Sequence, residues 1–177
     1  MVTMTPDQLV AAYGDGQREF PEMDLTNIDL FEADLPNIQL PGCCLVNGYL
    51  PYANLSQANL SNLHGYRAHL QDANLYGARL DAADLRETLL TRACLRSSSL
   101  VSANLAGADL TRADLRGANL QGANLQGAKL NRALMEHANL VGAKLKGCSL
   151  FRAVAVDVTG AIYDVTTIDP NGHYYGL

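Results

Sequence analysis

Residues 108–130 read ADLTRADLRGANLQGANLQGAKL, so that Leu returns at every fifth position and Ala stands two places before it. The same register extends in both directions without an inserted or deleted residue. Of the 27 five-residue units centred on residues 25 to 155, 24 have Leu at the centre, and the exceptions are Gly65, Met135 and Ala155. A repeat this regular has to be explained before any other feature, because it determines the fold.

Neither a continuous helix nor a flat strand accounts for a period of five. In an α-helix, five residues turn the chain by about 500°, so successive leucines would point in every direction. In a strand, neighbouring residues point to opposite faces, and an odd period would send alternate leucines to opposite faces. We therefore expect three extended residues followed by a two-residue corner. The Ala and the Leu then point inward, and the residue between them, here called the outer position, points outward.

The residues expected at the corners support this interpretation. The second corner position is often Gly or Asn, which tolerate the positive φ that a type II turn requires there. Pro occurs at the first corner position, where its fixed φ suits a turn. These corner residues are Gly at 42, 77, 107, 117, 122, 127, 142 and 147, Asn at 27, 37, 47 and 62, and Pro at 36, 41 and 51.

This tandem pattern, Ala-(Asp/Asn)-Leu followed by two corner residues, resembles the pentapeptide-repeat proteins over residues 20–155. The resemblance implies an all-β fold, a right-handed quadrilateral β-helix with four units in each coil. The 27 units would then form about 6.75 coils, and at ~4.8 Å between stacked strands the rod would be roughly 30 Å long. Every fourth unit would stack on the same side of the rod.

One unit departs from the pattern in a compensating way. Gly65 occupies a centre, and Leu63 stands two places before it, where Ala is usual. The large and the small residue have exchanged places, which roughly conserves the volume of the core. A functional kink at Gly65 is the alternative interpretation.

The N-terminal segment, residues 1–19, is expected to cap the first coil of a single domain that spans residues 1–177. Thr5 is a candidate N-cap, Pro6 fits the first turn, Gln8 completes a capping box and Gly14 is a candidate stop. Such a cap protects the strand edges that a β-helix exposes at its end. The side chains expected over the first coil are those of Leu9, Val10 and Tyr13. The lead-in after Tyr13 also resembles that of cyanobacterial pentapeptide-repeat proteins.

The C-terminal segment, residues 156–177, breaks the period and is expected to be an irregular cap, with a peptide-recognition tail as the alternative. Its apolar and aromatic side chains could close the far end of the rod. They are Ile162, Tyr163, Ile168, Tyr174 and Tyr175.

Because every fourth unit stacks, residues 20 apart in the sequence should lie above one another on the surface. This predicts two candidate partner-binding regions. One corner column runs Glu32, Tyr52, Asp72, Arg92, Arg112, Arg132, Arg152. Its stacked guanidinium groups could engage carboxylates or phosphates. Lys129 is expected on the same side, with Arg96 and Arg116 on the next. Asp109, Asp114 and Glu136 lie close enough to offset this charge, so plain solvated surface is the competing interpretation.

The second candidate region is a group of tyrosines in the early coils, Tyr49 and Tyr52 together with Tyr66 and Tyr76. They are expected to point outward, and exposed Tyr is enriched in protein interfaces. Charge is also uneven along the chain, with a net −7 over residues 1–60 and +5 over residues 61–155. Such polarity could orient a partner.

The sequence offers no active site. His64, His69 and Asp72 make a weak metal site, and no nucleotide loop or nucleophile–base set occurs at recognisable spacing. We expect no catalytic residue, no cofactor, no metal, no secretory signal and no membrane span. The inward positions of Cys43 and Cys148 and the opposite sides expected for Cys44 and Cys94 predict unpaired thiols, in keeping with a cytoplasmic protein.

Two functions remain open. The first is a non-enzymatic, rigid protein–protein interaction module, regulatory or scaffolding, which presents flat solenoid faces to an unidentified protein as a monomer or weak dimer. The family resemblance favours it, since cyanobacterial members include a regulator of cell differentiation. The second is a DNA mimic that binds DNA gyrase, as quinolone-resistance members do with an acidic surface. The basic later coils depart from that pattern. Direct nucleic-acid binding is disfavoured by the net charge of −5.

Overall fold

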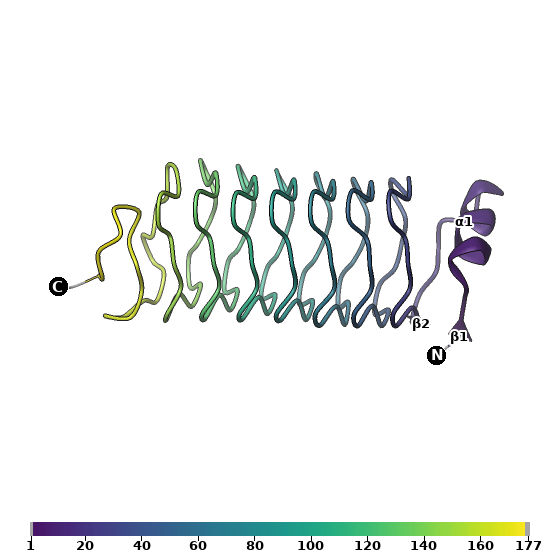
Figure 1. Ribbon diagram of the computed structural model, residues 1–177, viewed down its shortest axis with the longest axis horizontal. Helices are drawn as coiled ribbons and strands as arrows, with labels where there is room; N and C mark the ends of the chain where they lie inside the picture. Colours follow the sequence, from purple (N-terminus) through teal and green to yellow (C-terminus); the bar gives the residue numbers. More distant parts are fainter. Residues whose placement is uncertain (1, 176–177) are drawn as a thin grey trace.

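The computed structural model describes residues 2–175, which wind into a straight stack of coils with a helix at one end (Figure 1). Each coil takes four units, because outer positions pair in parallel with their counterparts four units further along, as Asp34 does with Asn54 and Asn54 with Asn74. The chain is therefore the right-handed quadrilateral β-helix that the resemblance to pentapeptide-repeat proteins implies. Leu, Ala and their substitutes fill the interior of the coils.

The corners form as the sequence predicts. At each corner the Leu carbonyl accepts a hydrogen bond from the amide three residues on, as Leu110 does from Ala113 at 2.9 Å. The second corner residue has a positive φ, 57° at Asn27 and 70° at Gly107. Its amide donates to the next coil, so that Arg112 N–H binds the carbonyl of Asn131 at 2.9 Å.

The core confirms the compensating exchange at Gly65. Leu63 is fully buried, and a Cβ added to Gly65 would come within 3.2 Å of Leu85 Cδ2 and 3.4 Å of Leu63 Cδ2. The Leu63 side chain thus occupies the space that a central Leu would fill. Cys43 and Cys148 are fully buried, as expected for small apolar residues, and burial raises the pKa of the Cys148 thiol to about 12.

The N-terminal cap combines a strand pair with a helix. Strand β1 (Val2–Thr3), which the sequence did not reveal, pairs in parallel with β2 (Met23–Asp24) of the first coil. Helix α1 (Pro6–Gly14) has Thr5 as its N-cap, with both bonds of the capping box to Gln8 present. The helix does end at Gly14, but the left-handed residue is Gly16, whose amide binds Tyr13 O while that of Gln17 binds Ala12 O. This is a Schellman motif.

Two of the three side chains expected over the first coil lie there. Leu9 is fully buried, and the Tyr13 hydroxyl donates to the carbonyl of Pro36 at 2.7 Å. The prediction for Val10 was wrong, because its side chain is 46% exposed. The short helix has room to bury only one stripe, which Leu9 and Tyr13 occupy.

The C-terminal cap is an incomplete coil in which Thr167 is buried and Val156, Val158, Ala161 and Tyr175 pack against the core. Ile162 and Ile168 pair with Lys144 and Ser149, so they occupy outer positions. The inward residue is Thr167, fully buried, whose hydroxyl donates to the carbonyl of Leu145 at 2.8 Å. The expectation that Ile162, Tyr163 and Tyr174 close the end was wrong, because all three are exposed.

Ile168 and Tyr175 are better covered than those three side chains, and Tyr175 packs on Tyr163 with ring centroids 4.6 Å apart.

Candidate interaction edge

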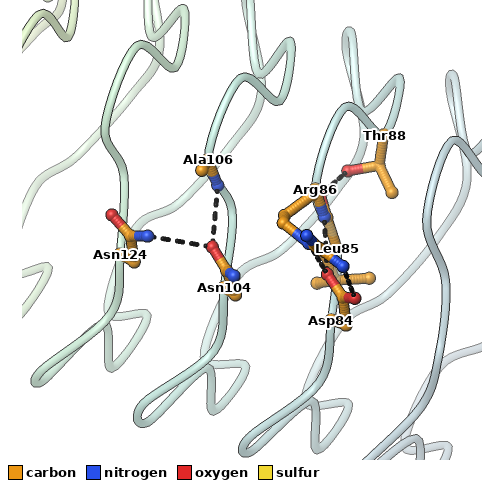
Figure 2. Close-up of polar contacts among 7 residues, drawn as sticks. All are labelled: Asp84, Leu85, Arg86, Thr88, Asn104, Ala106 and Asn124. Atoms are coloured by element: carbon orange, nitrogen blue, oxygen red, sulfur yellow. Dashed lines mark hydrogen bonds and ion pairs between the residues drawn. The ribbon is translucent and has the colours of Figure 1, made fainter.

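The outer position explains why Asp and Asn recur between Ala and Leu. The amide of the first corner residue has no backbone acceptor in the coil, and the side-chain oxygen of an outer Asp or Asn two residues earlier accepts its hydrogen bond. Figure 2 shows Asn104 Oδ1 accepting from the amide of Ala106 at 3.3 Å, and Asn124 Nδ2 donating to Asn104 Oδ1 at 3.0 Å. On this side the outward polar groups bind one another.

Arginines next to such carboxylates fold back onto them. Arg86 makes two hydrogen bonds to the Asp84 carboxylate, at 2.7 and 2.6 Å (Figure 2). Arg116 grips Asp114 in the same way, at 2.8 and 2.6 Å. These guanidinium bonds are the main reason why the pKa values of Asp84 and Asp114 lie below their usual range. Arg116, one of the sequence-predicted partner-binding residues, is therefore already engaged within the chain.

The predicted column of arginines forms a continuous edge in the later coils, here called the arginine edge. Arg92, Arg112, Arg132 and Arg152 all occupy second corner positions, with φ between 59° and 61°. Their side chains are exposed. A shallow groove of about 400 Å³ follows the edge and is lined by Thr91, Arg92, Thr111, Arg112, Asn131, Arg132 and Phe151.

The four arginines of this edge differ in their partners. Arg92 binds Asp72, one coil earlier, through two hydrogen bonds of 2.7 and 2.5 Å, which lowers the pKa of that carboxyl. The guanidinium of Arg152 lies 5.0 Å from the centre of the Phe151 ring. Among residues 2–175, Arg112 and Arg132 make no ion pair with a carboxylate. Both guanidinium groups are therefore available to a partner.

Backbone donors also face outward along this edge. The amide of Thr111 donates to the outer Asp109 at 3.0 Å. Leu89 and Lys129 stand where Asp109 does in the neighbouring coils, and the amides of Thr91 and Asn131 have no acceptor in the described part of the chain. The groove therefore combines guanidinium groups with backbone N–H donors, a donor set suited to oxyanions.

The same edge carries an aromatic patch in its early coils, formed by Phe31, Tyr49, Tyr52 and His69. Phe31 stacks on Tyr49 at 6.1 Å between ring centroids and meets Tyr52 edge-on at 5.9 Å. Tyr49 also contacts His69, at 5.7 Å. A second hollow of about 480 Å³ extends from Phe31 to Val10 on helix α1. Phe31 and Val10 were not predicted as site residues, although Phe31 lies one full coil before the corner residue Pro51.

The structure thus joins most of the predicted partner-binding residues and separates two of them. Tyr49, Tyr52 and the four arginines of the column lie along one edge. Arg96 and Arg116 belong to the next corner, where the charge of Arg96 contributes slightly to the low pKa of Asp114. Tyr66 packs with Arg67 and Arg86 instead of joining the aromatic patch.

Residues 2–175 contain no group of three or more His, Cys, Asp and Glu side chains placed to hold a metal ion. Within this part of the chain no helix has the length and apolar character needed to cross a membrane. The four cysteines are unpaired, and Cys44 and Cys94 are partly exposed at outer positions.

Comparison with known proteins gives a consistent result. A family model described as pentapeptide repeats matches residues 50–86, 68–105, 98–136 and 118–154. Among solved structures, HetL from the cyanobacterium Nostoc sp. strain PCC 7120, described as involved in heterocyst differentiation regulation, is 30% identical, with 97% of this chain and 100% of HetL covered and a TM-score of 0.55.

Another similar solved structure is that of a trypsin-treated variant of QnrB1, a plasmid-mediated fluoroquinolone resistance protein. Its sequence is 19% identical to that of this chain. The match covers 86% of this chain and 80% of QnrB1, and its TM-score of 0.57 establishes similarity of fold alone. No curated protein matches the chain.

Proposed function

The chain belongs to the pentapeptide-repeat family, and from that premise we propose that it is a non-enzymatic, rigid interaction module that binds a protein partner. The contact surface is the single edge formed by the aromatic patch and the arginine edge. The observation that carries this proposal is that the aromatic patch and the arginine edge are continuous. One corner column contains, in successive coils, Tyr52, Asp72, Arg92, Arg112 and Arg132.

The physical character of this edge suits a protein interface. Tyr, Phe and Arg are among the residue types enriched at protein interfaces. Every coil is bonded to the next by backbone hydrogen bonds, so the edge is ordered before binding and docking costs little conformational entropy. The flat sides, in contrast, have their outer Asp and Asn side chains bound within the chain, which makes them weaker candidates than the edge.

A regulatory role is supported by similarity to HetL. The two chains match over almost their full lengths, and HetL is described as a protein involved in regulating heterocyst differentiation. We propose a regulatory or scaffolding role in the cytoplasm, with no bound cofactor. The partner is a protein rather than a nucleic acid, because the acidic first coils would repel an extended polyanion.

Binding to DNA gyrase as a DNA mimic is the weaker alternative. Such a mimic needs carboxylates exposed along the rod, but Asp72, Asp84, Glu87 and Asp114 are each bound to an arginine. The similarity to QnrB1 supports the common fold. Inhibition of gyrase supercoiling by the purified protein would favour this alternative over the proposed one.

The proposal is tested by affinity capture from extracts of the source organism with the wild-type chain and two edge variants. Arg112→Glu/Arg132→Glu reverses the available cations, and Tyr49→Ala/Tyr52→Ala removes the aromatic patch. We expect the main captured protein to fall at least about tenfold with either variant, since such groups often contribute more than ~1.4 kcal/mol to binding.

Arg79→Glu serves as the matched control for the charge reversal, because Arg79 is an exposed outer residue on another side of the rod. Thermal unfolding verifies that all variants remain folded. Equal capture by the wild-type chain, the edge variants and the Arg79 variant would contradict the proposal.

A further inference from the structure

We infer that the partner presents an acidic α-helix to the arginine edge, an inference that rests on the proposed function. Its carboxylates, spaced one helical turn apart, bind the guanidinium groups of Arg112 and Arg132 and the outward amide of Asn131. The helix lies along the rod and extends toward the aromatic patch.

The chain itself shows how a carboxylate binds at such a corner. At Asp114, one oxygen accepts from the corner amide of Arg116 at 3.2 Å, and the carboxylate accepts two guanidinium hydrogen bonds from the same residue. Asp84 is bound in the same way by Arg86. A carboxylate held by a corner amide and an arginine is thus a recurring unit of this fold.

The corner of Asn131 and Arg132 offers the same two kinds of donor without an acidic residue at the outer position of its own unit. Lys129 stands where Asp would accept from the amide of Asn131, and it adds a further positive charge. The equivalent amide of Thr111 points to Asp109 on the outer surface, so the amide of Asn131 points outward as well. A carboxylate from a partner fits this set of donors.

The spacing of the arginines selects a helix. From Arg112 to Arg152 the edge rises by two coils, or about 9.6 Å at ~4.8 Å per coil. Acidic residues seven apart on an α-helix are about 10.5 Å apart along its axis, with a third between them on the same face. Alternate side chains of an extended strand would span about 13 Å over the same two steps. The helix matches to within about 1 Å, which flexible Arg side chains absorb.

The aromatic patch sets the length of the helix. Tyr52 lies three coils before Arg112, about 14 Å along the rod, which corresponds to roughly ten residues of α-helix. The partner helix should therefore carry an apolar side chain about ten positions beyond its acidic stripe. A long polyanion is a poorer fit, because the same edge continues into Asp72 and Glu32.

The inference is tested with short synthetic peptides, long enough to span the edge and labelled for fluorescence anisotropy at low salt. The first peptide is Ala-rich and helical, with Glu at positions i, i+3 and i+7 and Leu about ten positions further along. The second has the same composition with Glu at alternate positions. We expect the helical spacing to bind at least about fivefold more tightly, and salt to weaken both complexes.

Lys129→Asp gives the sharpest variant, because it supplies the chain with its own carboxylate two residues before Asn131. We expect this change to weaken binding of the helical peptide by about tenfold or more. Lys144→Asp is the matched control, since Lys144 is also an exposed outer residue but lies on the side of Asn104 and Asn124. The same change of charge there should alter affinity by less than about twofold.

The outcomes separate this inference from the proposed function. Equal affinity for the two peptides, or equal effects of Lys129→Asp and Lys144→Asp, would overturn the acidic helix as occupant. If Arg112→Glu/Arg132→Glu still abolished capture of the cellular partner, the interaction edge would stand. Tighter binding of a duplex DNA probe than of either peptide, lost on Lys129→Asp, would identify a nucleic acid in place of the helix.

Discussion

Two surfaces of the rod share the same backbone geometry: the side that carries Asp84, Asn104 and Asn124, and the arginine edge. They differ in whether their outward polar groups are bonded within the chain. On the first, outer Asp and Asn side chains accept the corner amides and one another's N–H groups (Figure 2). On the second, Lys129 replaces the acceptor and leaves the amide of Asn131 facing outward. A single outer residue per unit therefore decides whether a corner is closed within the chain or open to a ligand.

The largest effect on the free energy of unfolding is expected from substitutions in the core, which the two regions share. Leu105→Ala, behind the asparagine side, and Leu110→Ala, behind the arginine edge, each remove a fully buried side chain. Both should lower the free energy of unfolding by about 2–5 kcal/mol, because each leaves a cavity in the same continuous core. Chemical denaturation measures this loss. A cost below about 1 kcal/mol for only one of them would show that the two regions do not rest on a common core.

A smaller effect is expected from the outer positions themselves, and here the two regions should differ. Asn104→Ala removes the acceptor of two hydrogen bonds and should cost about 1 kcal/mol of unfolding free energy. Lys129→Ala removes an exposed side chain without such bonds and should change it by less than about 0.5 kcal/mol. Equal costs in denaturation experiments would contradict the distinction between a closed and an open corner.

The smallest effect concerns the left-handed backbone beneath the arginines. Arg132 has a φ of 60°, a conformation that costs a residue with a Cβ about 1–2 kcal/mol and that Gly adopts freely. Allowing for the flexibility that Gly adds to the unfolded chain, Arg132→Gly should raise the unfolding free energy by about 0.5 kcal/mol while weakening partner binding.

Ser102→Gly, at an equivalent corner with a φ of 57°, is the control for this substitution and should raise stability without affecting binding. Thermal unfolding and the peptide assay together measure the two effects. A loss of stability in both variants would show that the corner side chains contribute more than their strain removes.

The inward and outward positions and the corners could be predicted from the sequence, because the five-residue period permits few geometries. The coil of four units was implied by the resemblance to pentapeptide-repeat proteins. Stacking of every fourth unit then places Tyr52 and the arginines in one column. The corners at Pro36, Pro41 and Pro51 and the exchange of Leu63 with Gly65 follow from local chemistry alone. Burial of the inward cysteines follows from the same alternation.

What could not be predicted depends on side-chain rotamers and on the irregular ends. The pairing of Arg92 with Asp72 is one of several that the column allows, and nothing in the repeat selects it over a pairing with another coil. The cap residues follow no period, so the exposure of Val10 and Ile162 was missed. The outward amide of Asn131 does have a sequence signal, since Lys129 stands at an outer position, where 13 of the 27 units have an Asp or Asn acceptor.

Every coil of this molecule contains four units, so the position of a side chain around the rod depends on the number of units that precede it. Deleting one complete coil of four units would shorten the rod and leave every later side chain on the same side of it. Removing a single five-residue unit would instead rotate all that follows by a quarter turn, and Arg112 and Arg132 would leave the line of Tyr52. A lineage that keeps the composite edge can therefore grow or shrink only in full turns, and the length of such chains should change by four units at a time.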